Sequence, residues 1–243
     1  MSQPLLRIER LRVYYYSLRG IVKAVDNVDL ELNRGEVLGL AGESGCGKST
    51  LGFALLRLVP PPGRIVSGRI VFDGVDLVQL PEHILRRDFR WKRISMIFQG
   101  AMNALNPVKT VGDQIAEAIM THEKDVTKEE ALERAKKLLE MVGIDPRRVK
   151  AYPHELSGGM KQRVVIAMAL ALNPDLVIAD EPTTALDVVV QAQIVNLLKK
   201  LKMEHNMSLI LISHDLSLIA EMADKVAIMY AGKIVEFGPS DII

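Results

Sequence analysis

The sequence has few of the features that mark disulfide-stabilised, membrane-spanning or nucleic-acid-binding proteins. It contains a single cysteine, Cys46, so no disulfide can form within the chain and a reducing compartment is favoured. Its longest apolar stretch, residues 164–172, is about half of the roughly 20 residues that a membrane-spanning helix needs. The 31 lysine and arginine residues nearly balance the 30 aspartate and glutamate residues, which leaves no basic surplus for binding nucleic acid. The first residues also lack the apolar core of a signal peptide, so we expect a soluble cytosolic protein.

What the sequence does contain is an alternation of strands and helices. Its 243 residues fall between one and two domains in length. In the first third, apolar and charged residues alternate over 28–32, and a short, nearly continuous apolar run follows over 36–41. The last third predicts helix 159–172, strand 175–180, helix 187–203, strand 208–213, helix 215–222 and strand 225–230. Such alternation indicates an α/β fold with helices on the faces of a mainly parallel sheet.

The middle of the chain is helical. Thr127 and Glu130 fit a capping box, and apolar side chains then recur at helical spacing until Gly143. Roughly residues 100–156 therefore have the pattern of a helical insertion in an otherwise strand-rich chain.

A phosphate-binding loop is predicted at Gly42–Ser49, where the sequence GESGCGKS follows a buried strand and precedes a helix expected over 51–59. The backbone N–H groups of such a loop surround phosphate oxygens, and its glycines allow a close approach that larger side chains would block. Lys48 would reach the terminal phosphates, and the Ser49 hydroxyl would ligate Mg²⁺. The expected nucleotide-binding residues here are Gly42, Ser44, Gly45, Cys46, Gly47, Lys48, Ser49 and Thr50. The alternative is a glycine-rich turn with an incidental lysine.

Polar side chains at the ends of three other apolar strands predict the second half of a nucleotide site. Asp180 and Glu181 end one strand, and the carboxyl ends of parallel strands form the ligand-binding edge of a sheet. We assign Asp180 to Mg²⁺, through water, and Glu181 to the attacking water, as base or orienter. His214 would hold the γ-phosphate and that water, and Gln99 would ligate Mg²⁺ or sense the γ-phosphate. The alternatives are a pair of surface acids in a turn and a structural histidine.

The stretch Leu156–Met160, with the sequence LSGGM, resembles the signature motif of ABC ATPases. Methionine stands where that family most often has glutamine. The family's other motifs also occur here, in the family's order, from Tyr15 to the last strand. The resemblance implies a P-loop (RecA-like) ABC ATPase core with an N-terminal antiparallel β-subdomain and an inserted α-helical subdomain. The core would comprise residues 1–99 and 157–243, and the helical subdomain residues 100–156.

The resemblance also implies roles for single residues around the nucleotide. Tyr15 matches the aromatic residue that stacks on adenine, although Tyr14 and Tyr16 leave this register open. Gln99 matches the glutamine at the junction of the core and the helical subdomain. His214 matches the switch histidine.

Two further motifs imply that the site is completed by a second chain. Ser157, Gly158 and Gly159 match the signature residues, which in this family contact the γ-phosphate bound by the other protomer. The alternative for these three residues is an ordinary helix N-cap followed by a flexible turn. Asp187 matches an aspartate at the dimer interface.

A finer resemblance is carried by Tyr152–Arg163 and Ile97–Pro107, which are similar to the ATPase subunits of dipeptide and oligopeptide importers. Related subunits serve the uptake of nickel or oligosaccharides, and both substrates stay open as alternatives. Gly100 stands where the subfamily usually has aspartate, a change that removes no phosphate ligand. The sequence stops at Ile243, so we expect the usual C-terminal extension to be absent. Cys46 alone cannot ligate the iron–sulfur cluster that such extensions often carry.

The resemblance implies an ATP hydrolase that uses ATP and Mg²⁺ at the cytoplasmic face of the cell membrane. Its partners would be a second ATPase chain, identical or related, two transmembrane permease subunits and an extracytoplasmic solute-binding protein. A coupling helix of the permease subunits would dock on the helical insertion and the segment after Gln99. A soluble repair or translation-associated ABC ATPase is the alternative, but the chain has one cassette and no sustained heptad repeat. A small-molecule kinase would leave the LSGGM stretch unexplained.

Overall fold

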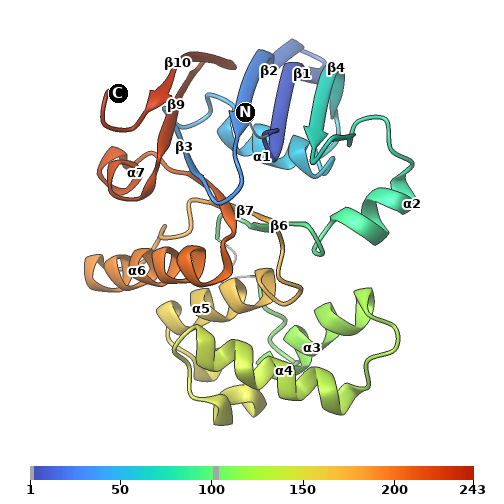
Figure 1. Cartoon of the computed structure of the whole chain (residues 1–243), viewed down its shortest axis with the longest axis vertical. Helices are drawn as coiled ribbons and strands as arrows, with labels where there is room; N and C mark the ends of the chain where they lie inside the picture. The colour runs from blue at the N-terminus through green and yellow to red at the C-terminus, as the bar shows by residue number, and fades with distance from the viewer. Residues whose placement is uncertain (1–2, 101–103) are drawn as a thin grey trace. The chain divides into compact units, whose positions relative to one another are not determined.

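The computed structural model describes residues 3–100 and 104–243, and it divides into two compact units (Figure 1). The first unit comprises Met1–Arg86 and Asn206–Ile243, and the second comprises Arg87–His205. Residues 101–103, which belong to the predicted docking segment after Gln99, lie outside the described residues. The division of the chain into a core and a helical subdomain at residues 100 and 156 stays a prediction.

The first unit contains an antiparallel sheet in which the strands follow the order β2-β1-β4-β5. These strands are β1 (Leu6–Ser17), β2 (Gly20–Leu32), β4 (Gly63–Phe72) and β5 (Val75–Asp76). Figure 1 shows β2, β1 and β4 side by side. Leu6, Ile8, Leu11 and Val13 are buried, while charged residues between them face outward. This alternation forms a sheet with one apolar face, and it confirms the N-terminal antiparallel β-subdomain.

A second group of strands in the same unit is mainly parallel. In it, β3 (Val37–Ala41) lies between β8 (Ser208–Ile212) and β9 (Lys225–Tyr230) and is parallel to both, while β10 (Lys233–Pro239) pairs with β9 in the antiparallel sense. Every residue of β3 and β8 is buried. The helices of this unit are α1 (Lys48–Leu55), α2 (Glu82–Ile84) and α7 (Leu216–Met222). Apolar side chains of both sheets and of α1 share one core.

The helix after the phosphate loop differs from its expected range of 51–59. It begins at Lys48, because Gly47 adopts the positive φ of 115° and starts the helix directly after the loop. It ends at Leu55, four residues early. Arg57 then takes a φ of 52°, and its guanidinium donates hydrogen bonds to the carbonyl oxygens of Leu77 and Leu80. These hydrogen bonds stabilise a turn at Arg57 in place of a longer helix.

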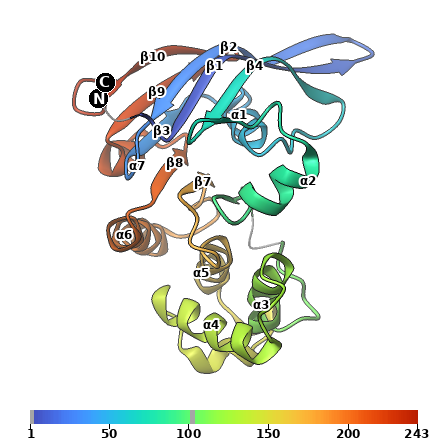
Figure 2. The same cartoon turned by 45° about the vertical axis from the view of Figure 1, so that its right-hand side comes forward.

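The second unit combines a pair of parallel strands with a set of helices. The strands are β6 (Ile94–Ile97) and β7 (Leu176–Asp180), and all of their residues are buried. The helices are α3 (Val111–His122), α4 (Lys128–Met141), α5 (Gly158–Ala169) and α6 (Val188–His205). Two 3-10 turns, Pro146–Lys150 and Pro153–Glu155, complete the elements named here. A π-helical turn, Leu85–Phe89, spans the point where the chain leaves the first unit and enters the second. Figure 2 shows α3, α4 and α5 close together within this unit.

The predicted capping box at the start of α4 is confirmed. Thr127 Oγ1 accepts a hydrogen bond from Glu130 N at 3.3 Å, and Glu130 Oε2 accepts one from Thr127 N at 2.9 Å. Two backbone N–H groups that the helix cannot satisfy by itself are therefore bonded.

We expect Thr127→Ala to lower the free energy of unfolding by about 1 kcal/mol, the usual effect of removing an N-cap side chain. Urea unfolding followed by circular dichroism measures this change. The matched control is Thr121→Ala, because the Thr121 hydroxyl only donates to the Glu117 carbonyl within a helix that is already formed. Equal effects of the two substitutions would contradict the capping assignment.

Candidate nucleotide site

The phosphate loop connects β3 to α1 and has the backbone of an anion-binding loop. Gly42, Gly45 and Gly47 have φ angles of 146°, 80° and 115°, a region that other residues rarely adopt. Lys48 is 5% exposed, and its ammonium donates to the carbonyl oxygens of Gly42 and Glu43 at 2.7 and 2.8 Å. The lysine side chain therefore folds back over the loop, where its charge faces the loop's interior.

Two segments far away in the sequence hold this loop from outside. A Cβ at Gly42 would clash with the Met229 carbonyl oxygen, and one at Gly47 would clash with the Ala24 carbonyl oxygen. Gly232, in the turn between β9 and β10, donates from its N–H to the Cys46 carbonyl at 2.9 Å. The loop is therefore enclosed by β2 and the β9–β10 turn, and its glycines are required by packing as well as by φ.

Tyr15 is the tyrosine of β1 that reaches the phosphate-loop helix. Its ring covers Gly63, where a Cβ would lie 2.5 Å from Cε1. Its hydroxyl is 3.5 Å from Thr50 Oγ1 in α1. Tyr15 therefore lies against the helix that follows the phosphate loop, and its role toward adenine stays a prediction.

The two neighbouring tyrosines have other partners. The Tyr14 hydroxyl donates to Asp26 Oδ1 at 2.6 Å, a bond that raises the pKa of Tyr14 and lowers the pKa of Asp26. The Arg64 guanidinium lies over the Tyr16 ring, 4.2 Å from its centroid. Because Tyr14 and Tyr16 are engaged elsewhere, these contacts favour Tyr15 as the tyrosine that matches the adenine-stacking residue of the family.

His214 lies at the same sheet edge as the phosphate loop. The strands β3 and β8 are parallel neighbours with Leu40 opposite Ile212, and Ser213 N donates to the Leu40 carbonyl at 3.2 Å. The residues that follow each strand therefore leave the sheet on one side. His214 is exposed there, and Asp215 caps α7 directly after it.

Within the second unit, the structure joins Gln99 to Glu181. The strands β6 and β7 are parallel with Ile97 opposite Ala179, so the residues after them emerge at the same edge. Gln99 Nε2 donates to Glu181 Oε2 at 2.8 Å, and the Thr184 hydroxyl donates to the same oxygen at 2.9 Å. Glu181 has a φ of 47°, an unusual angle for a non-glycine residue. These contacts fix the direction of its carboxylate.

The signature stretch and Asp187 both begin helices. Ser157 caps α5, because its Oγ accepts a hydrogen bond from Met160 N at 3.3 Å. Asp187 Oδ1 accepts one from Val190 N at 2.9 Å at the start of α6. Ser157 and Asp187 are exposed. The N-cap interpretation of Ser157 is therefore correct as local structure, and a role toward a second chain stays a prediction.

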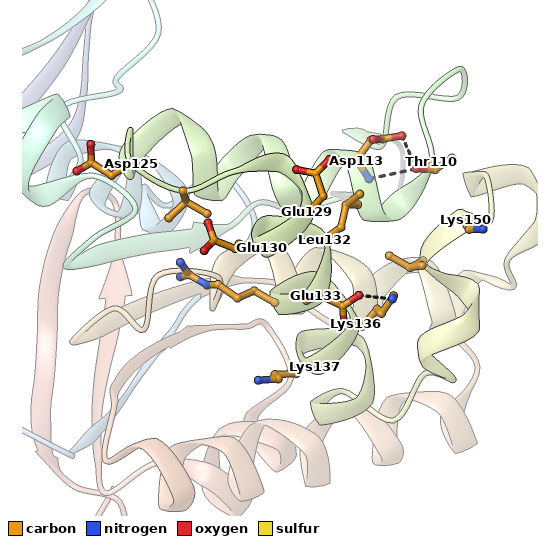
Figure 3. Close-up of a pocket in the computed structure, with 13 residues that line it drawn as sticks. Thr110, Asp113, Asp125, Glu129, Glu130, Leu132, Glu133, Lys136, Lys137 and Lys150 are labelled. Carbon is orange, nitrogen blue, oxygen red and sulfur yellow. Dashed lines mark hydrogen bonds and ion pairs between the residues drawn. The ribbon is translucent and has the colours of Figure 1, made fainter.

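A groove of about 870 Å³ runs along α4 and lies apart from these residues (Figure 3). Its walls are mostly charged side chains, including an ion pair between Glu133 and Lys136. The Thr110 hydroxyl donates to Asp113 at 2.7 Å and lowers the pKa of that carboxyl. None of the sequence-predicted site residues lines this groove, so it is not the candidate nucleotide site.

The sequence did not predict the residues that hold the site residues in place through hydrogen bonds. Thr184 holds the Glu181 carboxylate, and Gly232 holds the Cys46 carbonyl. Gln191 Nε2 donates to the Thr183 carbonyl at 3.2 Å. The sequence signal for Gly232 is only a turn between two strands, and the signal for Thr184 is its place three residues after Glu181.

Comparison with known families identifies the chain. Residues 25–184 match the model of the ABC transporter family. The chain belongs to that family. It is an ABC ATPase, and the region of the match includes the phosphate loop, the signature stretch and the Asp180–Glu181 pair.

Individual relatives resemble this ABC ATPase over nearly all of its length. It is 51% identical over 242 residues to the oligopeptide transport ATP-binding protein OppD of Bacillus subtilis, which covers 98% of this chain and 67% of OppD. It is 48% identical over 239 residues to the dipeptide transport ATP-binding protein DppD of the same organism, with 97% and 71% covered. OppD of Escherichia coli is 50% identical over 239 residues, with 98% and 70% covered.

Solved structures confirm the ABC ATPase fold. The dimeric ATP-binding cassette MJ0796 bound to ADP and Pi is 29% identical and superposes with a TM-score of 0.83 over 97% of this chain and 98% of that chain. The protein cbiO1 of Clostridium perfringens is 28% identical with the same TM-score, over 99% and 90%. No helix within residues 3–100 and 104–243 is long and apolar enough to cross a membrane.

Proposed function

We propose that this ABC ATPase hydrolyses ATP to power the uptake of dipeptides or oligopeptides. The observation that carries the proposal is the identity of 48–51% to three peptide-transport ATP-binding proteins over 97–98% of the chain. This similarity extends well beyond the nucleotide motifs that all ABC ATPases share. A nickel or oligosaccharide importer of the same subfamily is the alternative outcome.

ATP would bind along the phosphate loop, with adenine on Tyr15 and the terminal phosphates near Lys48. Mg²⁺ would be held by Ser49, Gln99 and Asp180, and it would neutralise charge that develops on the phosphates. The chemistry of this donor set fits the ion, because all three side chains offer the oxygen ligands that Mg²⁺ prefers. Asp180 is 1% exposed, at the carboxyl end of the buried strand β7.

Glu181 would orient and deprotonate the attacking water, and His214 would hold that water against the γ-phosphate. The hydrogen bonds from Gln99 and Thr184 to Glu181 Oε2 support this role, since they fix the direction of the carboxylate. Ser157, Gly158, Gly159 and Asp187 would act on the nucleotide bound by a second ATPase chain. The dimeric solved structure of a related cassette supports such a pair.

The remaining partners would be two transmembrane permease subunits and a solute-binding protein, with this chain on the cytoplasmic face of the membrane. The relatives' names, which describe ATP-binding proteins of transport systems, support this assembly.

The test is to reconstitute the chain with the permease, binding-protein and any second ATPase subunits encoded beside it, in liposomes that contain ATP. Trialanine is expected to stimulate ATP hydrolysis and to accumulate in the lumen. Ni²⁺ and maltotriose serve as parallel substrates. Stimulation by either of these but not by trialanine, or by none of the three, would contradict the proposal.

A further inference from the structure

We infer that Val190 of α6 is a positioning residue for the signature stretch of the same chain, and that it acts through direct contact with Gly159. The inference rests on the proposed function, because it concerns how the signature is held for action on a partner's nucleotide. A Cβ built on Gly159 would lie 2.6 Å from Val190 Cγ1 and 3.6 Å from Val190 Cγ2. Carbon atoms in contact normally stay near 3.5–4.0 Å, so glycine is the residue that fits.

The backbone at Gly159 does not itself require glycine. Gly159 lies in the first turn of α5, and it is not among the residues with positive φ. Alanine stabilises a helix relative to glycine, so local preference favours alanine at this position. Within this chain, the requirement for glycine therefore comes from α6. Val190 cannot easily turn aside, because a β-branched side chain in a helix has one strongly preferred χ1 rotamer.

Further contacts continue the same seam between α5 and α6. One turn along α5, the Arg163 guanidinium donates to Gln193 Oε1 of α6 at 3.2 Å and to the Val142 carbonyl at 2.7 Å. Arg163 is four residues after Gly159, and Gln193 is three residues after Val190, so both pairs lie on the facing sides of the two helices. The start of α5 is therefore placed by α6.

The start of α6 is in turn tied to the catalytic carboxylate. Asp187 accepts from Val190 N, Gln191 Nε2 donates to the Thr183 carbonyl, and the Thr184 hydroxyl donates to Glu181 Oε2. A continuous series of contacts thus links Glu181 to Gly159 within one chain. One short segment, residues 181–190, therefore holds two groups. It holds the carboxylate of Glu181, which would act on the nucleotide bound by this chain, and the signature stretch, which would act on the nucleotide bound by the partner.

The experiment is a size-exchange cycle in the assembled transporter, with Gly159→Ala, Val190→Ala and the double variant. Gly159→Ala is expected to lower ATP turnover at least about tenfold through overpacking. Trinitrophenyl-ATP binding should change less than about twofold, because the phosphate loop is untouched. The double variant should regain turnover to within about threefold of Val190→Ala. If Gly159→Ala fails to fold but the double variant folds, that result supports the steric contact as well as a recovery of turnover would.

The matched control is Gly159→Ala combined with Val189→Ala, since Val189 is the adjacent valine and is 68% exposed. This pair should give no recovery. Full activity of Gly159→Ala alone, or equal recovery with Val189→Ala, would overturn the inference. Absence of ATP hydrolysis by the wild-type assembly would instead contradict the proposed function, and melting temperatures of the four chains then still report whether the double variant relieves the clash.

Discussion

Glu181→Gln is expected to slow ATP hydrolysis by roughly 10²–10⁴-fold, the usual range for lost acid–base assistance, while ATP binding is retained. Glutamine keeps the size of the side chain and can still bond to Gln99 and Thr184, so the arrangement around Oε2 changes little. What disappears is the negative charge that accepts a proton from the attacking water. Steady-state phosphate release and trinitrophenyl-ATP titration measure the two quantities separately.

The control for this substitution is Glu140→Gln, the same chemical change on the exposed surface of α4. Its turnover should equal that of the wild type. Near wild-type turnover in Glu181→Gln would contradict the assignment of Glu181. Loss of ATP binding in that variant would show instead that the carboxylate acts on the nucleotide itself.

Lys48→Met is expected to weaken ATP binding by roughly ten- to a hundredfold, because charge-assisted hydrogen bonds contribute about 1.5–3 kcal/mol. Methionine has a similar length but no donor, so it fills the space without reaching the phosphates. The buried ammonium now donates to Gly42 and Glu43, and those carbonyls lose a partner as well. Equilibrium titration with trinitrophenyl-ATP gives the change in dissociation constant.

A matched substitution separates this effect from a general loss of charge. Lys200→Met removes an exposed lysine that pairs only loosely with Glu204 at 3.7 Å. Its affinity for ATP should stay at the wild-type value. If both lysine variants bind ATP as the wild type does, Lys48 is not a phosphate ligand.

The parts of the site that sequence could predict are those built by neighbouring residues. The phosphate loop needs its own glycines, a preceding buried strand and a following helix, and all three are adjacent in sequence. The proximity of Gln99 and Glu181 could also be predicted from the sequence. Each residue follows a short apolar strand, and parallel strands bring their carboxyl ends to one edge.

The parts that could not be predicted depend on contacts between segments that are distant in sequence. Gly232 lies near the end of the chain, far in sequence from the Cys46 carbonyl to which it donates a hydrogen bond. Gly159 and Val190 are separated by a whole helix and a strand. The hydrophobic periodicity of a helix predicts which of its faces is buried, but not which other helix packs against that face. The early end of α1 also depends on a distant contact. The carbonyl oxygens that accept hydrogen bonds from Arg57 belong to Leu77 and Leu80, about twenty residues later in the chain.

The outer supports of the phosphate loop have a thermodynamic consequence. Met229, Gly232 and Ala24 hold the loop backbone in its anion-binding shape through backbone contacts that form when the chain folds. A loop that is already in shape loses little conformational freedom when its ligand arrives. Nucleotide binding at this loop should therefore show only a small change in heat capacity, unlike binding that orders a disordered segment. Affinity is then governed by charge and dehydration of the phosphates.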